Sequence, residues 1–325
     1  MIKVRQVLLC SAVPFFFLAA SCVRENSSRK QDIHVQQMSG FPNQEFGYEL
    51  GVSACYAGII GNKLVMAGGC NFAGKSAAEG GPKYFYKGIY TAEITEDSVL
   101  VWKQVGELPS PVAYGVSISR SGEMILIGGN NADGGLTSVF RLKLAEYGGA
   151  ILDTLPSLPF ALDNMSGAAS GNTIYVAGGN RNGSPSTSML SLNLNEPELG
   201  WKEEVPFPGA ARVQPVCAVQ DGMLYLWGGF CPSQNGGEAS VATDGYRYLP
   251  LQERWEPVPA PAVAETGEPL TLTGGTSCVW SDSIILCTGG VDKDIFLDAI
   301  SGDYKRIAKE DYLLQPVAWY RFNGR

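Results

Sequence analysis

The sequence predicts an all-β fold, a β-propeller, because one short pattern recurs along most of its 325 residues. In each copy an apolar run ends in a pair of glycines, and a two-residue turn signal precedes that pair. The runs are LVMAGG (Leu64 to Gly69), MILIGG (Met124 to Gly129), IYVAGG (Ile174 to Gly179), LYLWGG (Leu224 to Gly229) and ILCTGG (Ile285 to Gly290). Their first glycines lie at 68, 128, 178, 228 and 289, so the steps are 60, 50, 50 and 61 residues. A β-sandwich would space its strands similarly but would not repeat one unit in this way.

Each copy is interpreted as a blade of four antiparallel strands. The predicted hairpin turns are Gly61-Asn62, Ser121-Gly122, Gly171-Asn172, Asp221-Gly222 and Ser281-Asp282. A strand rich in small residues, such as YGVSIS, comes before each turn. Farther along come pairs of large residues: Tyr90 and Trp102, Leu190 and Trp201, and Tyr248 and Trp255. Because a period of about 50 residues is typical of kelch repeats, we expect a kelch-type propeller in which the glycines lie where blades crowd together.

Composition supports many tight turns around a hydrophobic core. The chain has 40 glycines and 19 prolines and is still 45% hydrophobic. Proline-rich segments between the copies, which we call joints, suit connections from an outer strand to the next inner one. They are ELPSP (Glu107 to Pro111), SLPF (Ser157 to Phe160), VPFPG (Val205 to Gly209) and VPAPA (Val258 to Ala262). A net charge of −8 argues against nucleic acid as a partner. The sequence has one histidine, His34, and no phosphate loop or Cys/His ligand spacing, so we expect neither a metal nor a cofactor.

The first residues predict targeting to the bacterial cell envelope. Residues 1–21 combine a basic start with an apolar run that is too short to span a membrane, as in a signal peptide. The run ends in LAASC, which resembles a lipobox, so we expect Cys22 to carry lipid and anchor the protein to a membrane. An ordinary signal peptide cut nearby is the alternative. Residues 22–45 are then a flexible tether and residues 46–325 the propeller. Since no acidic retention signal follows Cys22, we expect an outer-membrane lipoprotein facing the periplasm.

The cysteines of the propeller leave two interpretations open. They are Cys55, Cys70, Cys217, Cys231, Cys278 and Cys287. An oxidising compartment permits disulfides, and Cys55/Cys70 and Cys278/Cys287 are nearly symmetric about predicted turns. Buried free cysteines acting as small hydrophobic residues are the alternative.

Two stretches resemble one family closely. GVSACYAGIIGNKLVMAGGCNFAGK with EGGPKYFYKGIY, and then AYGVSISRSGEMILIGGNNADGG, are similar to the cyclically permuted mutarotases, kelch relatives of N-acetylneuraminate epimerase. RVQP (Arg212 to Pro215) and GGVDKDIF (Gly289 to Phe296) extend the similarity. The resemblance implies a six-bladed propeller that interconverts the α and β anomers of free sialic acid, a small-molecule sugar. Such chemistry needs a base, an acid, and a cation for the sugar carboxylate.

The resemblance also implies candidate substrate-binding residues. They are Asn71, Phe72 and Glu79 in the loop after the first glycine pair, and Tyr114 and Arg212 at the starts of inner strands. Arg212 is the natural clamp for the carboxylate, and a pair with an acidic neighbour is its alternative role. Glu79 is either a site residue or a solvated loop carboxylate. Val112 stands where relatives carry an arginine.

The sequence departs from the family in one respect that bears on catalysis. The relatives' proton-transferring glutamate lies in an N-G-E-x-K-P-G-x-R-T string of the last blade, and no such string occurs in these residues. The next repeat would place its glycines around residue 340, past Arg325. We therefore expect about five blades, a C-terminally incomplete propeller, unassigned catalytic residues and little mutarotase activity. A non-catalytic propeller that binds glycan or protein at the cell envelope is the alternative function.

Overall fold

The computed structural model describes residues 38–95, 99–233, 237–263, 266–281, 284–291 and 293–301. The predicted signal peptide, Cys22 and most of the tether lie outside these residues. Within the described part of the chain, no helix is long and apolar enough to cross a membrane.

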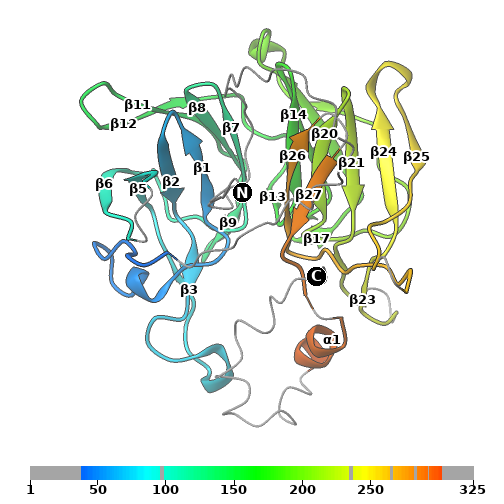
Figure 1. Ribbon diagram of the computed structural model, residues 1–325, viewed down its shortest axis with the longest axis horizontal. Helices are drawn as coiled ribbons and strands as arrows, with labels where there is room; N and C mark the ends of the chain where they lie inside the picture. Colours follow the sequence, from blue (N-terminus) through cyan, green and yellow to red (C-terminus); the bar gives the residue numbers. More distant parts are fainter. Residues whose placement is uncertain are drawn as a thin grey trace, which may run out of the picture.

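Four antiparallel sheets repeat the same four-stranded meander, as the sequence predicts (Figure 1). Blade 1 contains β1 (Tyr56–Ile60), β2 (Lys63–Ala67), β5 (Gly88–Glu93) and β6 (Trp102–Glu107). Blade 2 contains β7 (Val116–Arg120), β8 (Glu123–Ile127), β11 (Val139–Leu144) and β12 (Ala150–Thr154). Blade 3 contains β14 (Ser166–Ser170), β15 (Thr173–Ala177), β18 (Met189–Asn193) and β19 (Lys202–Glu203). Blade 4 contains β20 (Val216–Gln220), β21 (Met223–Trp227), β24 (Gly245–Leu249) and β25 (Arg254–Pro257).

A fifth unit is present as an inner hairpin, β26 (Thr276–Ser281) with β27 (Ile284–Thr288). The expectation of about five blades is therefore refined to four complete blades and this hairpin within the described residues. The register shifts between Val279 and Ser281, so Ser281 closes β26 instead of opening the predicted turn. Beyond the last glycine pair lies a helix that the sequence reading missed, α1 (Lys293–Ser301).

Short ribbons follow the glycine pairs, and some of them extend below the blades in Figure 1. The ribbons are β3 (Cys70–Asn71) with β4 (Tyr84–Phe85), β9 (Asn130–Asn131) with β10 (Gly134–Gly135), β13 (Leu162–Asp163) with β16 (Asn180–Arg181) and β17 (Ser184–Pro185), and β22 (Phe230–Cys231) with β23 (Ser240–Val241). Single turns of 3-10 helix are η1 (Tyr48–Leu50), η2 (Ala77–Glu79), η3 (Pro197–Leu199) and η4 (Pro250–Gln252). Residues of the candidate site lie in or next to two of these ribbons, β3/β4 and β13/β16.

The paired glycines allow close approach between blades and donate a hydrogen bond across the junction. Both residues of each pair have positive φ, for example 57° at Gly128 and 99° at Gly129. A Cβ on Gly129 would come within 2.6 Å of the Ala113 carbonyl oxygen. The second glycine also donates its N–H to the joint that opens the next blade, from Gly129 to Leu162 O at 2.9 Å and from Gly179 to Arg212 O at 2.8 Å. Only glycine meets these demands easily, which explains the repeated motif.

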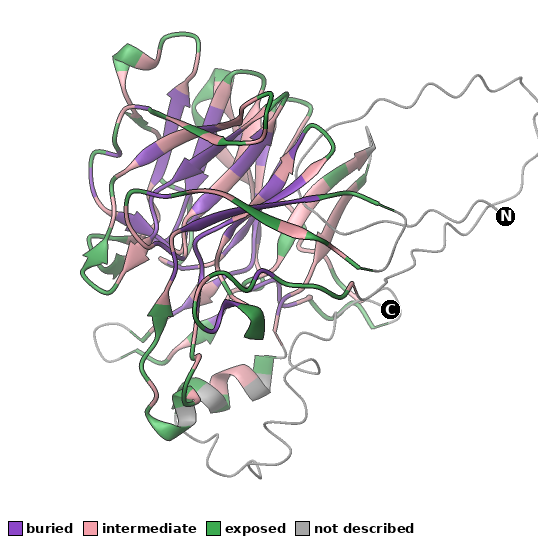
Figure 2. Cartoon of the chain, turned by 90° about the vertical axis from the view of Figure 1, so that its left-hand side faces the viewer, coloured by how far each residue is buried: buried purple, intermediate pink, exposed green. Residues whose placement is uncertain are grey.

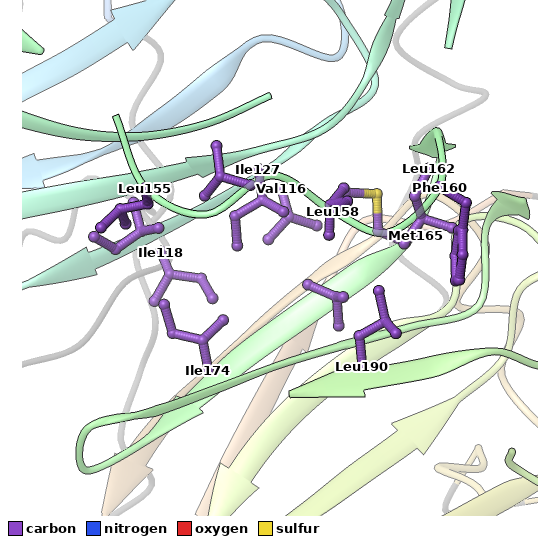
Figure 3. Close-up of a cluster of buried hydrophobic side chains, with 13 residues drawn as sticks. Val116, Ile118, Ile127, Leu155, Leu158, Phe160, Leu162, Met165, Ile174 and Leu190 are labelled. Carbon is purple, nitrogen blue, oxygen red and sulfur yellow. The ribbon is translucent and has the colours of Figure 1, made fainter. Parts of the chain in front are cut away.

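Apolar side chains fill each space between neighbouring blades. Between blades 2 and 3, Val116 and Ile127 face Ile174 and Leu190, and the joint residue Phe160 joins them (Figure 3). Buried residues are concentrated in the strands of the blades, while the ribbons and α1 are more exposed (Figure 2). The outer tryptophans pack there as predicted, and their indole N–H groups reach the previous joint: Trp201 to Pro156 O at 2.9 Å and Trp255 to Val205 O at 2.8 Å.

The small-residue inner strands lie side by side and are joined by serine hydroxyls. Ser117 Oγ donates to Ala57 O at 2.8 Å and accepts from Ala57 N at 3.0 Å. Ser277 Oγ donates to Cys217 O at 2.6 Å in the same way. Small side chains are needed because these strands approach one another closely.

Two further expectations are resolved by the structure. Residues 39–45 pack on blade 1 instead of forming tether: Leu100 N donates to Ser39 O, and Glu45 accepts hydrogen bonds from Gly88 N and Tyr90 Oη at 2.9 and 2.7 Å. The packed domain therefore begins before residue 46. The six propeller cysteines are free thiols that are buried or half-buried, which is the second of the two interpretations.

Candidate functional site

Five residues with left-handed backbones stand two positions before the five inner strands. Their φ angles are 56° at Ala54, 61° at Tyr114, 54° at Asn164, 52° at Gln214 and 69° at Gly274. Each of the last four donates its N–H to the carbonyl of the one before it: Tyr114 to Ala54 at 2.9 Å, Asn164 to Tyr114 at 2.7 Å, Gln214 to Asn164 at 2.6 Å, and Gly274 to Gln214 at 3.1 Å. We call these five residues the entry ring. Strained non-glycine backbone of this kind is concentrated at functional sites.

Polar side chains of the entry ring form a network around a carboxylate. Gln214 Nε2 donates to Asn164 Oδ1 at 2.9 Å. Asp163 Oδ1 accepts from Asn164 Nδ2 at 2.5 Å and from Asn180 Nδ2 at 2.8 Å. Asp163 is 5% exposed and makes no ion pair with the described residues, and its Oδ2 accepts no hydrogen bond from them. A carboxylate held by amides alone retains an acceptor for a hydroxyl-bearing ligand.

A lysine joins two of the predicted site residues beside this network. Lys83 Nζ donates to Tyr114 Oη at 2.9 Å. The same ammonium lies 4.9 Å from the centroid of the Tyr114 ring and 5.6 Å from that of Phe72. Phe72 and Tyr114 are thus brought together from two blades, with Lys83 between them. Cation–π contacts hold an ammonium in place without neutralising its charge.

Asn71 and Glu79 are occupied with local structure. Asn71 Nδ2 donates to Gly47 O and Gly51 O, both at 2.8 Å, and its Oδ1 accepts from Tyr86 Oη at 2.7 Å. Asn71 thereby fixes the η1 turn on blade 1. Glu79 ends η2 in a capping box, and its Oε2 accepts from Ser76 Oγ at 2.8 Å. Neither side chain is among those that meet at the entry ring.

Arg212 is committed to an acidic neighbour, the alternative role that the sequence left open. Arg212 is 1% exposed, and its guanidinium donates to both carboxylate oxygens of Asp244, with Nη2 to Oδ2 at 2.9 Å. Nε donates to Ala210 O at 2.9 Å and Nη1 to Gly228 O at 3.1 Å. Burial opposes ionisation of Asp244, but the hydrogen bonds and charge of Arg212 outweigh it and hold the pKa of that carboxyl below its ordinary value. Arg212 therefore fastens the joint before blade 4.

Comparison with known proteins assigns the family. The family described as N-acetylneuraminate epimerase matches residues 18–151 and 155–324. The chain belongs to the N-acetylneuraminate epimerase family. Among curated proteins, the N-acetylneuraminate epimerase of Salmonella arizonae is 33% identical over 178 residues, which is 52% of this chain and 44% of the relative. That of Haemophilus influenzae (strain PittEE) is 35% identical over 143 residues, 44% of this chain and 35% of the relative. The matched part spans less than half the length of either relative.

A solved structure supports the fold of this N-acetylneuraminate epimerase family member. "Structure of YjhT" aligns with a TM-score of 0.59 and covers 74% of this chain and 78% of that chain, at 12% sequence identity. The likeness establishes a kelch-type β-propeller architecture, as the repeat predicts. The described residues contain no group of three or more side chains suited to a metal ion.

The sequence reading missed Lys83, Asp163, Asn164 and Gln214. The sequence did hold a signal for Asn164 and Gln214. They occupy a position that recurs in every copy, two residues before each inner strand, at residues 54, 114, 164, 214 and 274. Aligning the five copies on their inner strands would have brought Asn164 and Gln214 into the same column as Tyr114. Lys83 has no such repeat signal, because it lies in the loop just before β4. Asp163 lies at a repeated position, bridged to Asn180 as Ala113 is to Asn130 and Val213 to Phe230, but the equivalent residues of the other copies are not acidic.

Proposed function

We propose that this protein binds free sialic acid and interconverts its α and β anomers. Membership of a family whose members are named epimerases carries the proposal. The entry ring supports it, since Asp163, Asn164 and Gln214 offer acceptors and donors suited to sugar hydroxyls. Anomer exchange opens and recloses a hemiketal ring, so a base removes the anomeric proton and an acid protonates the ring oxygen. Among the described residues, Tyr114, Asp163 and the neighbouring Lys83 carry exchangeable protons or accept them at the ring.

The test is the rate of anomer exchange measured by NMR. A sialidase releases the sugar as one anomer, and its conversion to the other is followed with and without the 325-residue protein. We expect the protein to broaden the NMR signals of the sugar, which reports binding. Because the sequence lacks the N-G-E-x-K-P-G-x-R-T string, we expect anomer exchange about 10²–10⁴-fold slower than with the Salmonella arizonae relative.

Each NMR outcome has a definite meaning. If the protein causes neither broadening of the sugar signals nor faster anomer exchange, the proposal is refuted. Broadening with no acceleration at all would favour the alternative, a non-catalytic propeller that binds glycan. Exchange as fast as that of the relative would show that other groups carry the chemistry, and Asp163→Asn would then be the first variant to compare.

We also propose that the protein works in the cell envelope as a lipoprotein. The support is the sequence LAASC (Leu18 to Cys22) and the basic, apolar segment ahead of it. A lipid on Cys22 would anchor the propeller to the outer membrane, facing the periplasm. Fractionation of cells that express the full chain tests this placement.

A further inference from the structure

We propose that Lys83, rather than Arg212, supplies the positive charge that binds the carboxylate of the sugar. This inference rests on the proposed function and specifies which side chain recognises the acidic substrate. Lys83 lies within EGGPKYFYKGIY, between the first glycine pair and β5, and no motif singles it out there.

Ion pairing separates Lys83 from most other cations of the chain. Among the lysines and arginines that the structure describes, those that form no ion pair with a described residue are Lys75, Lys83, Lys103 and Lys293. Of these, Lys83 alone is hydrogen-bonded to a member of the entry ring, through Tyr114 Oη at 2.9 Å. The guanidinium of Arg212, in contrast, is buried and already faces the carboxylate of Asp244.

The surroundings of Lys83 hold its charge in place and leave it available. An ammonium has three N–H donors, and Tyr114 Oη accepts one of them. The rings of Phe72 and Tyr114, 5.6 and 4.9 Å from Nζ, attract the cation through their faces without cancelling its charge. Two donors therefore remain for an incoming carboxylate. Preorganisation of this kind lowers the entropy lost when a ligand binds.

The position of Lys83 also fits a sugar that is acidic at one end and hydroxylated at the other. Asn164 N donates to the Tyr114 carbonyl at 2.7 Å, so the amide and carboxylate network follows directly along the ring. Asp163 repels a carboxylate but accepts hydrogen bonds from hydroxyls. The sugar carboxylate is thus directed to Lys83, and hydroxyl groups are directed to Asp163 and Asn164.

The experiment compares two ligands against a set of variants. The ligands are N-acetylneuraminate and its methyl ester, which lacks the negative charge, and the dissociation constants are measured by calorimetry. The variants are Lys83→Met, which keeps length and removes charge, Lys83→Arg, which keeps charge, and Lys75→Met. Lys75 is the matched control, since it is an exposed lysine of the same loop with no ion pair to a described residue. Thermal unfolding confirms that each variant is folded.

We expect Lys83→Met to weaken binding of the acid by about tenfold and to leave binding of the ester unchanged. Lys83→Arg should bind the acid within about threefold of wild type, and Lys75→Met should match wild type for both ligands. Raising the salt concentration should weaken acid binding by wild type more than by Lys83→Met.

The outcomes that overturn the inference are distinguishable from failure of the proposed function. Equal losses for acid and ester in Lys83→Met, or no loss for either, would reject the role of Lys83 while leaving sialic acid binding intact. If wild-type protein binds neither ligand, the proposed function fails and this inference fails with it.

Discussion

Replacing Asp244 by Asn should destabilise the protein markedly, because it leaves the buried Arg212 guanidinium without its counter-charge. Removing one partner of a buried pair generally costs about 3–5 kcal/mol. Here the Asp244 side chain is 38% exposed, so water can reach the gap, and Arg212 keeps the carbonyls of Ala210 and Gly228. We therefore expect a loss of about 2–3 kcal/mol in the free energy of unfolding at pH 7.

The difference in stability between wild type and Asp244→Asn should also depend on pH. The folded protein holds the pKa of Asp244 below its ordinary value, so the stabilisation is present above about pH 3.9 and is lost as the pH falls through the lower, folded value. The amide side chain of the Asp244→Asn variant cannot titrate. The gap in stability between wild type and this variant should therefore be widest near neutral pH and should close in acid.

Urea unfolding followed by tryptophan fluorescence measures both quantities. The matched control is Asp153→Asn, which breaks an exposed pair with Lys143 (3.1 Å, side chains 47% and 41% exposed). That change should lower stability by less than about 1 kcal/mol. A loss of under about 0.5 kcal/mol for Asp244→Asn at pH 7, or a gap that widens in acid, would refute the reasoning about Arg212.

Three further predictions follow from single features. Gly129→Ala should lower the free energy of unfolding in urea by at least about 2 kcal/mol, because φ is 99° and a Cβ would overlap Ala113 O. Its control, Gly122→Ala, should cost about 1 kcal/mol, because φ is 76° there but the space around the residue is open. Equal losses for the two variants would contradict this. Burial raises the pKa of the Cys217 thiol to about 12, so a thiol reagent at pH 8 should label it only after unfolding; rapid labelling of the native protein would contradict its burial. Cys22→Ala should release the protein from membranes, and unchanged fractionation would reject lipidation at that residue.

The repeat could be predicted from the sequence because its causes act over a few residues. The two-residue turn and the apolar run that ends in two glycines are contained within about ten residues, so LVMAGG or IYVAGG indicates its strand from local sequence alone. The same locality explains the one misplaced turn: the register shift before Ser281 depends on pairing across the hairpin and not on the turn residues alone.

The candidate site depended on the tertiary structure, because its members meet only once the blades pack. Lys83 reaches Tyr114 across 31 positions of sequence, Arg212 reaches Asp244 across 32, and Gln214 reaches Asn164 across 50. Sequence placed Tyr114 and Arg212 at strand starts, and in the structure they lie in the connections just before β7 and β20. Packing between blades decided that Arg212 faces an acidic partner, and that Lys83 keeps its charge between two aromatic rings.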